Sequence, residues 1–455
     1  MKIKLNPDRT KIKSIKVSPD IIPADGHDIC NYVFRYGMAN FQIQAVLRLD
    51  GRLDFVKLLK AVRLSIDAEP VLGCRFVCSD PPYWKRLDDI DNVRFCTMVE
   101  TNDTDTAVKR FLESPLDMDN GPVLKLKLVR SDSFDTICIK INHACSDGAG
   151  VKEYVTLLSD IYCRLYSDVN YVPTPSIRTK SDHRKLFKAV GIKYPTATVV
   201  VPQKSPTPLW KFPWKNIRQT ESRYAICKLS DGELDKLKNY SKSKGATIND
   251  LILTAYYRAM FKISKPPYGI PMDIPLTVSL RRYLPEQKAE AIRNLSGGFM
   301  TALKRKHHES FEGTLSRVMS RTRNIKTGHP GIENAIWAEY VEKMDFRQFC
   351  NHYKTLSKIN DMNSLNPFYK LYGCSPALSN LGLLSATPIK FGDTAVIDAH
   401  ILPPTVRAPG FLLLAGSYNG VLTLTLAYYK STVHRVDMQR VIEKIKEELV
   451  KVIED

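Results

Sequence analysis

The chain has 455 residues, of which 44% are hydrophobic and 9% aromatic, a composition typical of a folded globular protein and not of a disordered one. This length exceeds one ordinary core and indicates two domains or one large two-lobed domain. The 67 lysine and arginine residues outnumber the 48 aspartate and glutamate residues and give a formal net charge of +19, which favours an anionic partner.

Targeting and membrane signals are weak. The basic first residues are not followed by the apolar core of a secretory signal, and no stretch reaches the roughly eighteen apolar residues of a transmembrane helix. The basic residues lie in short clusters without a recognisable nucleic-acid-binding module. We therefore expect a cytoplasmic monomer without a nucleic-acid partner, for which peripheral contact with a membrane stays open.

The cysteines give no metal or disulfide signal. Ten cysteines without paired spacing are typical of reduced thiols. The closest pair, Cys74 and Cys78, has no second cluster of cysteine or histidine at ligand spacing. The sequence therefore predicts no metal site.

The first half of the chain alternates strands and helices. Residues 41–51 alternate well enough for a strand, and an apolar pattern at helical spacing follows until Pro70 ends it. Residues 123–130 and 136–142 then predict an antiparallel pair of strands.

A histidine stands at the corner after this pair, in the stretch "HACSDGAG". An apolar helical stripe runs from Val151 to Leu165, so His143 and Asp147 lie in a strand-to-helix connection, where catalytic groups are often carried. From the corner alone, a structural histidine and a helix-capping aspartate are the simpler interpretations. Cys145 is a third candidate, as a nucleophile, but chain neighbours rarely present a thiolate and its base to each other.

The second half follows a proline-containing crossover between about residues 167 and 220. It predicts a strand at 223–230, a helix, and a second helix that opens with a capping box at Thr247 and Asp250. In the next predicted strand, alternation places Arg281 on the face away from the apolar layer. Asn419-Gly420 is the strongest hairpin signal, and an amphipathic helix ends the chain.

These motifs, in this order, resemble a known family. "HACSDG" looks like the H-x-x-x-D-G motif of the chloramphenicol-acetyltransferase-like superfamily, which includes peptide-synthetase condensation domains, BAHD acyltransferases, alcohol acetyltransferases and wax ester synthases. Further stretches match the family in order: "LDFVKLLKAVRLSIDAEPVLGCRF", "GATINDLILTAYYRAM", "VSLRR", "NLSGGF" and "LSNLG". The likeness spans roughly residues 20 to 450. The chain departs from it at Asn142, where many members have a second histidine, and in lacking the BAHD "DFGWG" motif.

The resemblance implies an α/β (α+β) fold of two chloramphenicol-acetyltransferase-like lobes. Each lobe would hold a largely antiparallel or mixed sheet flanked by helices, with the active site in a tunnel between them. Residues 1–180 would form the N-terminal lobe with the HACSDG motif, 181–220 the crossover and 221–455 the C-terminal lobe.

The resemblance also implies acyl transfer from a thioester to a hydroxyl or amine, with His143 as general base. An imidazole with a pKa near ~6.5 suits that task. Asp147 and Gly148 would complete the motif, with Asp147 in a structural ion pair with Arg281. Four polar residues of the second half would line the substrate channel or merely satisfy turns: Asn294, Ser296, Ser379 and Asn380.

Three functions fit these residues. The first is an acyl-CoA-dependent acyltransferase of the alcohol acetyltransferase or wax ester synthase type, the second a condensation-type enzyme with a carrier-protein-bound donor, and the third an inactive relative that binds a partner. No permanently bound cofactor is expected, and coenzyme A or a phosphopantetheine thioester would be the co-substrate. The intact motif disfavours the third, and the lack of a fused carrier domain in this sequence favours the first.

Overall fold

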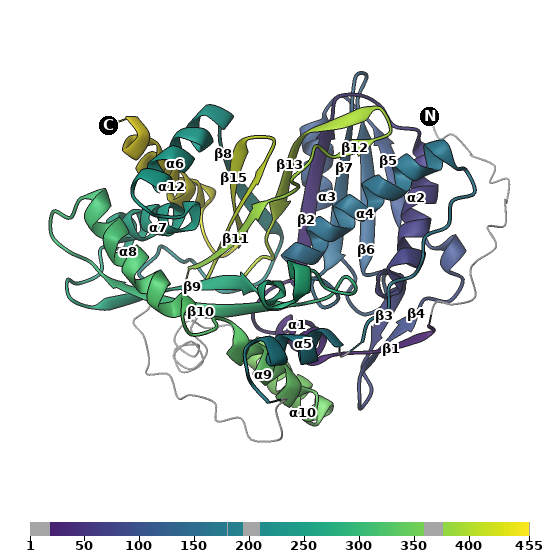
Figure 1. Cartoon of the computed structure of the whole chain (residues 1–455), viewed down its shortest axis with the longest axis horizontal. Coiled ribbons are helices and arrows are strands. Elements are labelled where there is room, and N and C mark those ends of the chain that lie inside the picture. The colour runs from purple at the N-terminus through teal and green to yellow at the C-terminus, as the bar shows by residue number, and fades with distance from the viewer. Residues whose placement is uncertain (1–18, 180, 194–209, 359–375, 455) are drawn as a thin grey trace.

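The computed structural model describes residues 19–179, 181–193, 210–358 and 376–454. Figure 1 shows two lobes side by side, each a sheet with helices packed on it, and a group of helices beneath them. The predicted fold class, mixed helices and sheets in two lobes, is confirmed.

The sheet of the first lobe has six strands, of which β5 and β6 run parallel and all other neighbours antiparallel. In spatial order they are β12 (Lys390–Phe391), β13 (Thr394–Leu402), β2 (Gln42–Leu49), β7 (Asp135–Asn142), β6 (Leu124–Arg130) and β5 (Cys96–Glu100). The predicted strand pair is therefore β6 and β7, one strand inside the edge.

Helices cover both faces of this sheet. Helices α2 (Phe55–Ala68) and α4 (Gly148–Ser167) pack on the face that carries Ile137, Ile139 and Ile141, and all three isoleucines are fully buried. Helix α3 (Thr104–Glu113) covers the other face. Burying each isoleucine contributes about 1.5–3 kcal/mol, so β7 is firmly fixed at the point where it leads into the histidine corner.

The second lobe has its own six-stranded sheet, in which β11 runs parallel to both neighbours. Its strands, in spatial order, are β10 (Ser296–Lys304), β9 (Pro271–Ser279), β11 (Ala377–Leu383), β14 (Leu412–Tyr418), β15 (Val421–Tyr429) and β8 (Ser222–Leu229). Its helices are α6 (Asp231–Ser243), α7 (Ile248–Ser264), α8 (Phe311–Lys326) and α12 (Arg435–Glu454). Trp210, which follows the part of the crossover outside the described residues, is buried in this core.

A third group of elements lies beneath the lobes in Figure 1. It consists of α1 (Gly26–Phe34), α5 (Ser181–Ala189), α9 (Ile332–Val341), α10 (Phe346–Ser357) and a small sheet of β1 (Ile21–Pro23), β4 (Tyr83–Arg86) and β3 (Cys74–Val77). Four short 3-10 turns complete the described elements: η1 (Pro70–Gly73), η2 (Ile90–Asn92), η3 (Leu280–Tyr283) and η4 (Pro285–Gln287). Helix α5 lies within the stretch expected to be the proline-containing crossover.

Strands β12 and β13 leave the second half of the chain and join the sheet of the first lobe, where β13 pairs with β2. The lobe boundary at residue 221 stays a prediction. Residues 390–402, although they follow that boundary in the chain, extend the sheet of the first lobe. Among the residues described, none of the helices combines the length and the apolar character that a bilayer crossing requires.

One local prediction was wrong. Arg281 does not lie on the strand, because β9 ends at Ser279 and η3 begins at Leu280. Ser279 caps this turn by accepting a hydrogen bond from the Arg281 backbone N–H. The turn ends the strand alternation, so that alternation does not set the direction of the Arg281 side chain, which is buried.

Candidate active site

The histidine corner joins the end of β7 to the start of α4. The backbone N–H of His143 donates to the carbonyl of Phe41 at 2.7 Å, and Asp147 has extended backbone and caps α4. Its Oδ1 accepts the N–H of Gly150 at 2.8 Å, which satisfies one of the free donors of the first helical turn. Asp147 is therefore a helix cap, as the simpler interpretation holds, but only one of its two carboxylate oxygens, Oδ1, has this role.

The His143 side chain is half-buried and contacts Asn294 of the second half of the chain. Nδ1 of the ring lies 3.2 Å from Oδ1 of Asn294, while Nδ2 of Asn294 donates to the carbonyl of Ala144 at 2.7 Å. Because a carbonyl only accepts, the amide nitrogen must face Ala144 and the amide oxygen must face the ring. His143 therefore carries its proton on Nδ1 and has a lone pair on Nε2.

Burial sets the protonation state of this ring. It lowers the pKa of His143 below the usual range, against weaker opposing effects that include the Asp147 charge and the Asn294 hydrogen bond. The imidazole is therefore neutral at neutral pH, as a proton acceptor must be.

Asp147 and Arg281 form a buried ion pair, with 2.7 Å between Oδ2 and Nη1. Asp147 is 1% exposed and Arg281 4% exposed. Oδ2 also accepts the backbone N–H of Leu295 at 2.8 Å. Burial favours the neutral carboxyl, but Arg281 and the backbone donors outweigh it, so the pKa of Asp147 is lowered. The pair fixes the corner to the second half of the chain.

Glu153 is a second carboxylate on Arg281 that the sequence analysis missed. Its Oε1 accepts from Nε of Arg281 at 2.8 Å, and Nη2 of the same guanidinium donates to the carbonyl of Arg293 at 3.0 Å. Burial, with the nearby Asp147 charge, raises the pKa of Glu153 to about 7 despite the attraction of Arg281. The only sequence signal for Glu153 is its position in the second turn of α4, beside the apolar stripe.

A second buried arginine holds the corner from the crossover segment. Nη2 of Arg178 donates to the carbonyl of Cys145 at 2.5 Å, and its Nη1 pairs with Oδ2 of Asp28 at 2.9 Å. Trp84 donates to the same carboxylate oxygen at 2.8 Å. The carbonyls of Ala144 and Cys145 are thus both bound by side chains from distant segments, which sequence reasoning could not connect.

The remaining predicted site residues divide into two groups. Ser296 lies 3.5 Å from Oδ2 of Asp147, and Gly148 packs against Leu381 so closely that a Cβ there would lie 2.7 Å from Cδ2 of Leu381. Ser379 instead accepts from Thr277 at 2.9 Å, and Asn380 donates to Asn249 at 3.2 Å. Asn294, Ser296 and Arg281 therefore meet the corner, while the contacts of the Ser379 and Asn380 side chains lie within the second lobe.

Cys145 does not have the properties of a nucleophile. Its thiol donates to the carbonyl of Asn142 at 3.1 Å, and burial raises its pKa. Asn142 accepts the N–H of Ala144 at 2.8 Å through its own side chain. Both residues shape the loop around His143.

A cavity of about 630 Å³ lies between the lobes on the α3 face of the first sheet. Residues of β2 and α3 line it from one lobe and residues of β8 from the other, with Val46, Leu112 and Tyr224 among them. His143 does not belong to this lining, so the candidate site is defined by the contacts of the corner and not by this cavity.

Comparison of this chain with known proteins finds condensation domains among its relatives. The family model "Condensation domain" matches residues 36–178. Bacitracin synthase 3 of Bacillus licheniformis is 22% identical over 325 residues, which are 68% of this chain but only 5% of that synthase.

Solved structures share the fold over almost the whole chain. The first condensation domain of the calcium-dependent antibiotic synthetase, in complex with a substrate analogue, is similar with a TM-score of 0.67 at 13% identity, covering 96% of this chain and 97% of that one. The trichothecene 15-O-acetyltransferase from Fusarium sporotrichioides is similar with a TM-score of 0.67 at 13% identity, covering 97% of each chain. The resemblance to condensation domains is confirmed over residues 36–178, and the solved structures show that the fold is shared over nearly the whole chain.

Proposed function

We propose that this protein is an acyltransferase that moves an acyl group from a thioester to a hydroxyl or amine acceptor, with His143 as the general base. The observation that carries the proposal is the orientation of His143, whose Nδ1 faces Asn294 while Nε2 keeps its lone pair. The neutral state of the ring and the likeness to an O-acetyltransferase and to condensation domains support it.

The reaction needs one proton acceptor and no acyl-enzyme. As the acceptor oxygen or nitrogen bonds to the thioester carbonyl carbon, its proton passes to Nε2 of His143 and the carbonyl electrons move to oxygen. When the tetrahedral intermediate collapses, the C=O bond reforms, the C–S bond breaks, and the proton on Nε2 passes to the leaving sulfur. Backbone N–H groups near Gly148, or a hydroxyl of the second lobe, would stabilise the oxyanion.

The other motif residues act through the shape of the corner. Asp147 and Arg281 hold the loop between β7 and α4 against the segment that contains Asn294, and Asn294 fixes the tautomer of His143. They are positioning residues. We assign Ser296 to the substrate side of the corner and Ser379 and Asn380 to substrate contacts further along β11. Asn294, expected from the sequence to line the channel, is fully buried against His143 and Ala144 and positions the base.

Two donors fit the charge of the chain. We favour acyl-CoA, whose phosphates suit a net charge of +19. The likeness to bacitracin synthase 3 and to a synthetase condensation domain favours the alternative, an acyl group on the phosphopantetheine of a carrier protein. Neither donor requires a permanently bound cofactor.

The experiment assays the purified chain with a panel of acyl-CoA donors and with the same acyl groups on a carrier protein, using alcohol and amine acceptors. Release of the donor thiol gives the rate, and mass spectrometry identifies the ester or amide. His143→Ala should lower the rate by about 10²–10⁴-fold while donor binding stays largely intact.

Cys145→Ala is the matched variant, since it changes the neighbouring loop position without removing the base. We expect it to stay active and to form no acyl-enzyme detectable by intact mass. Full activity of His143→Ala, or loss of activity only in Cys145→Ala, would contradict the proposal.

A further inference from the structure

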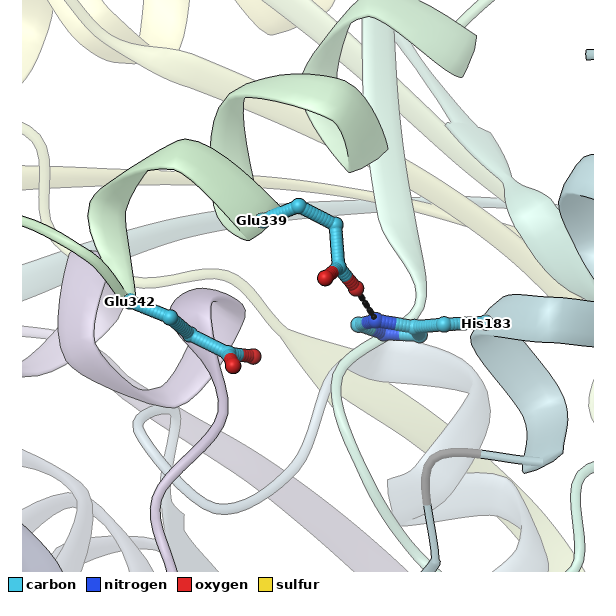
Figure 2. A group of neighbouring side chains, drawn as sticks. All are labelled: His183, Glu339 and Glu342. Carbon is cyan, nitrogen blue, oxygen red and sulfur yellow. Dashed lines mark hydrogen bonds and ion pairs between the residues drawn. The ribbon is translucent and has the colours of Figure 1, made fainter. Parts of the chain in front are cut away.

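A group of metal-ligating side chains lies outside the histidine corner, where α5 meets α9. Figure 2 shows His183 of α5 facing Glu339 and Glu342 at the C-terminal end of α9. One candidate ligand atom from each of the three side chains lies within 4.8 Å of those of the other two. Nδ1 of His183 is 2.6 Å from Oε1 of Glu339.

The cluster is buried and contains imidazole nitrogens without partners. His183 is 1% exposed and Glu339 3% exposed, while Glu342 is half-buried. His27 of α1 is 6% exposed, and its ring packs edge-on against that of His183 with 5.5 Å between centroids. Within the described residues, neither ring nitrogen of His27, nor Nε2 of His183, has a hydrogen-bond partner. Burial without a partner is costly, and a metal ion bound by His27 would account for one of these three nitrogens.

The surroundings carry further negative charge. Asp25 precedes His27 by two residues, and Asp182 directly precedes His183. Both carboxylates pair with Arg293, Asp25 at 2.8 Å and Asp182 at 3.1 Å. That guanidinium is therefore shared between two other carboxylates. The backbone N–H of Gly26 donates to Oε1 of Glu342 at 3.0 Å and orients that carboxylate.

We propose that His183, Glu339 and Glu342 bind a divalent transition-metal ion such as Zn²⁺, with His27 as the fourth ligand. Imidazole nitrogen together with carboxylate oxygen suits zinc, manganese or iron, whereas magnesium and calcium prefer oxygen ligands alone. The ion would take the place of the hydrogen bond between Nδ1 of His183 and Oε1 of Glu339. Because 2.6 Å is shorter than the separation of two ligands on one tetrahedral zinc ion, these two side chains would have to move apart, and the neutral ring would then carry its proton on Nε2. His27 is not one of the three residues whose ligand atoms already lie within 4.8 Å of one another, so its side chain would have to turn for a ring nitrogen to reach the ion.

Four protein ligands would make this a structural metal site and not a catalytic one. The ion would fasten α1, α5 and α9 to one another beneath the two lobes. The site differs from the expectation of no metal drawn from the sequence, because its ligands come from three helices and only Glu339 and Glu342 are spaced as neighbours on a helix. It does not rest on the proposed acyl transfer, since none of its ligands contacts His143.

The experiment uses the full chain without a polyhistidine tag. The protein is stripped with a chelator, dialysed against Zn²⁺ or Mg²⁺, and its metal content is measured by mass spectrometry. Affinity for Zn²⁺ is measured by competition with a chromophoric chelator, and unfolding temperature with and without the ion. We expect one zinc ion per chain, no retained magnesium, and an unfolding temperature about 3 °C higher at free Zn²⁺ one hundred times Kd.

Two variants and one control test the ligands. Glu342→Gln keeps an oxygen to accept from Gly26, and His183→Gln keeps a polar side chain; each should weaken Zn²⁺ binding by on the order of 100-fold and abolish the thermal shift. His308→Ala removes one of two exposed histidines that are adjacent in the chain, His307 and His308, and this variant should bind zinc like wild type. If His183→Gln does not fold, the zinc affinity of Glu342→Gln alone tests the ligand assignment. Absence of bound zinc in wild type, equal affinity in Glu342→Gln, or loss of binding in His308→Ala would overturn the proposal.

Discussion

Asn294 contacts both the ring and the backbone of the histidine corner: its Oδ1 lies 3.2 Å from Nδ1 of His143 and its Nδ2 2.7 Å from the carbonyl of Ala144. This one amide therefore selects the tautomer of the base and fixes the loop that carries it. Its own Nδ2 also lies 3.5 Å from Asp28, a second acceptor that keeps the amide in this orientation.

Replacing Asn294 should change the pH profile of the proposed reaction. In Asn294→Asp a carboxylate faces Nδ1–H and stabilises the imidazolium, which raises the pKa of His143. The base then stays protonated to a higher pH, so the acid limb of kcat/KM should move to higher pH. Asn294→Ala should lower kcat by less than the about 10²–10⁴-fold expected for loss of the base itself.

The control for this series is Asn324→Asp, which adds the same charge at an exposed position of α8. Its pH profile should match that of wild type. An acid limb that stays in place in Asn294→Asp would show that the amide does not control the ring.

Loss of the Asp147 carboxylate should destabilise the fold as well as slow the reaction. Asp147→Ala leaves the buried Arg281 with one carboxylate partner, Glu153, and frees the N–H groups of Leu295 and Gly150. We expect a cost on the order of 3 kcal/mol, measured as a lower midpoint in urea. Asp147→Asn, which keeps acceptor oxygen but no charge, should lie between the alanine variant and wild type. A midpoint equal to wild type in Asp147→Ala would mean that the ion pair is unimportant for folding.

Features with local signals could be predicted from the sequence. The capping box at Thr247 and Asp250 is present at the start of α7. Asn419 and Gly420 both adopt positive φ, as a two-residue hairpin turn requires, and join β14 to β15. In each case the residues that specify the structure are within a few positions of one another.

Features that depend on contacts between distant segments could not be predicted from the sequence. Nothing in the local pattern indicates that β13 crosses to the first lobe, or that Glu153 shares Arg281 with Asp147. The motif identified His143 and Asp147, but the sequence assigned Asn294 only to a channel or a turn, and the structure places it on the ring of His143. Long-range hydrogen bonds leave no periodic trace in a single sequence.

The contact between α1 and α9 should not tolerate a side chain at Gly26. A Cβ there would lie 1.8 Å from the carbonyl oxygen of Ala338, a backbone atom that cannot move aside without shifting α9. Gly26→Ala should cost about 1–3 kcal/mol or more and lower the unfolding temperature. Gly232→Ala is the matched control, because nothing lies within 4 Å of its added Cβ, and it should be neutral or slightly stabilising. Equal stability of the two variants would contradict the close approach of the helices.

The last prediction concerns Glu153, whose pKa is raised from 4.5 to about 7, mainly by burial. Between these values the unfolded chain has lost the proton while the folded chain keeps it, so this group reduces stability as pH rises through the window. Glu153→Gln removes that effect. Its unfolding temperature relative to wild type should therefore increase as pH rises from about 4.5 to 7 and then level off. Asp147, with its lowered pKa, acts in the opposite sense, because its stabilisation is complete above the ordinary carboxyl pKa and is lost at more acid pH. Glu443→Gln, an exposed change on α12, should show no such trend. An advantage of Glu153→Gln that grows toward acid pH would mean that Glu153 is ionised in the fold and that Arg281 holds two full charges.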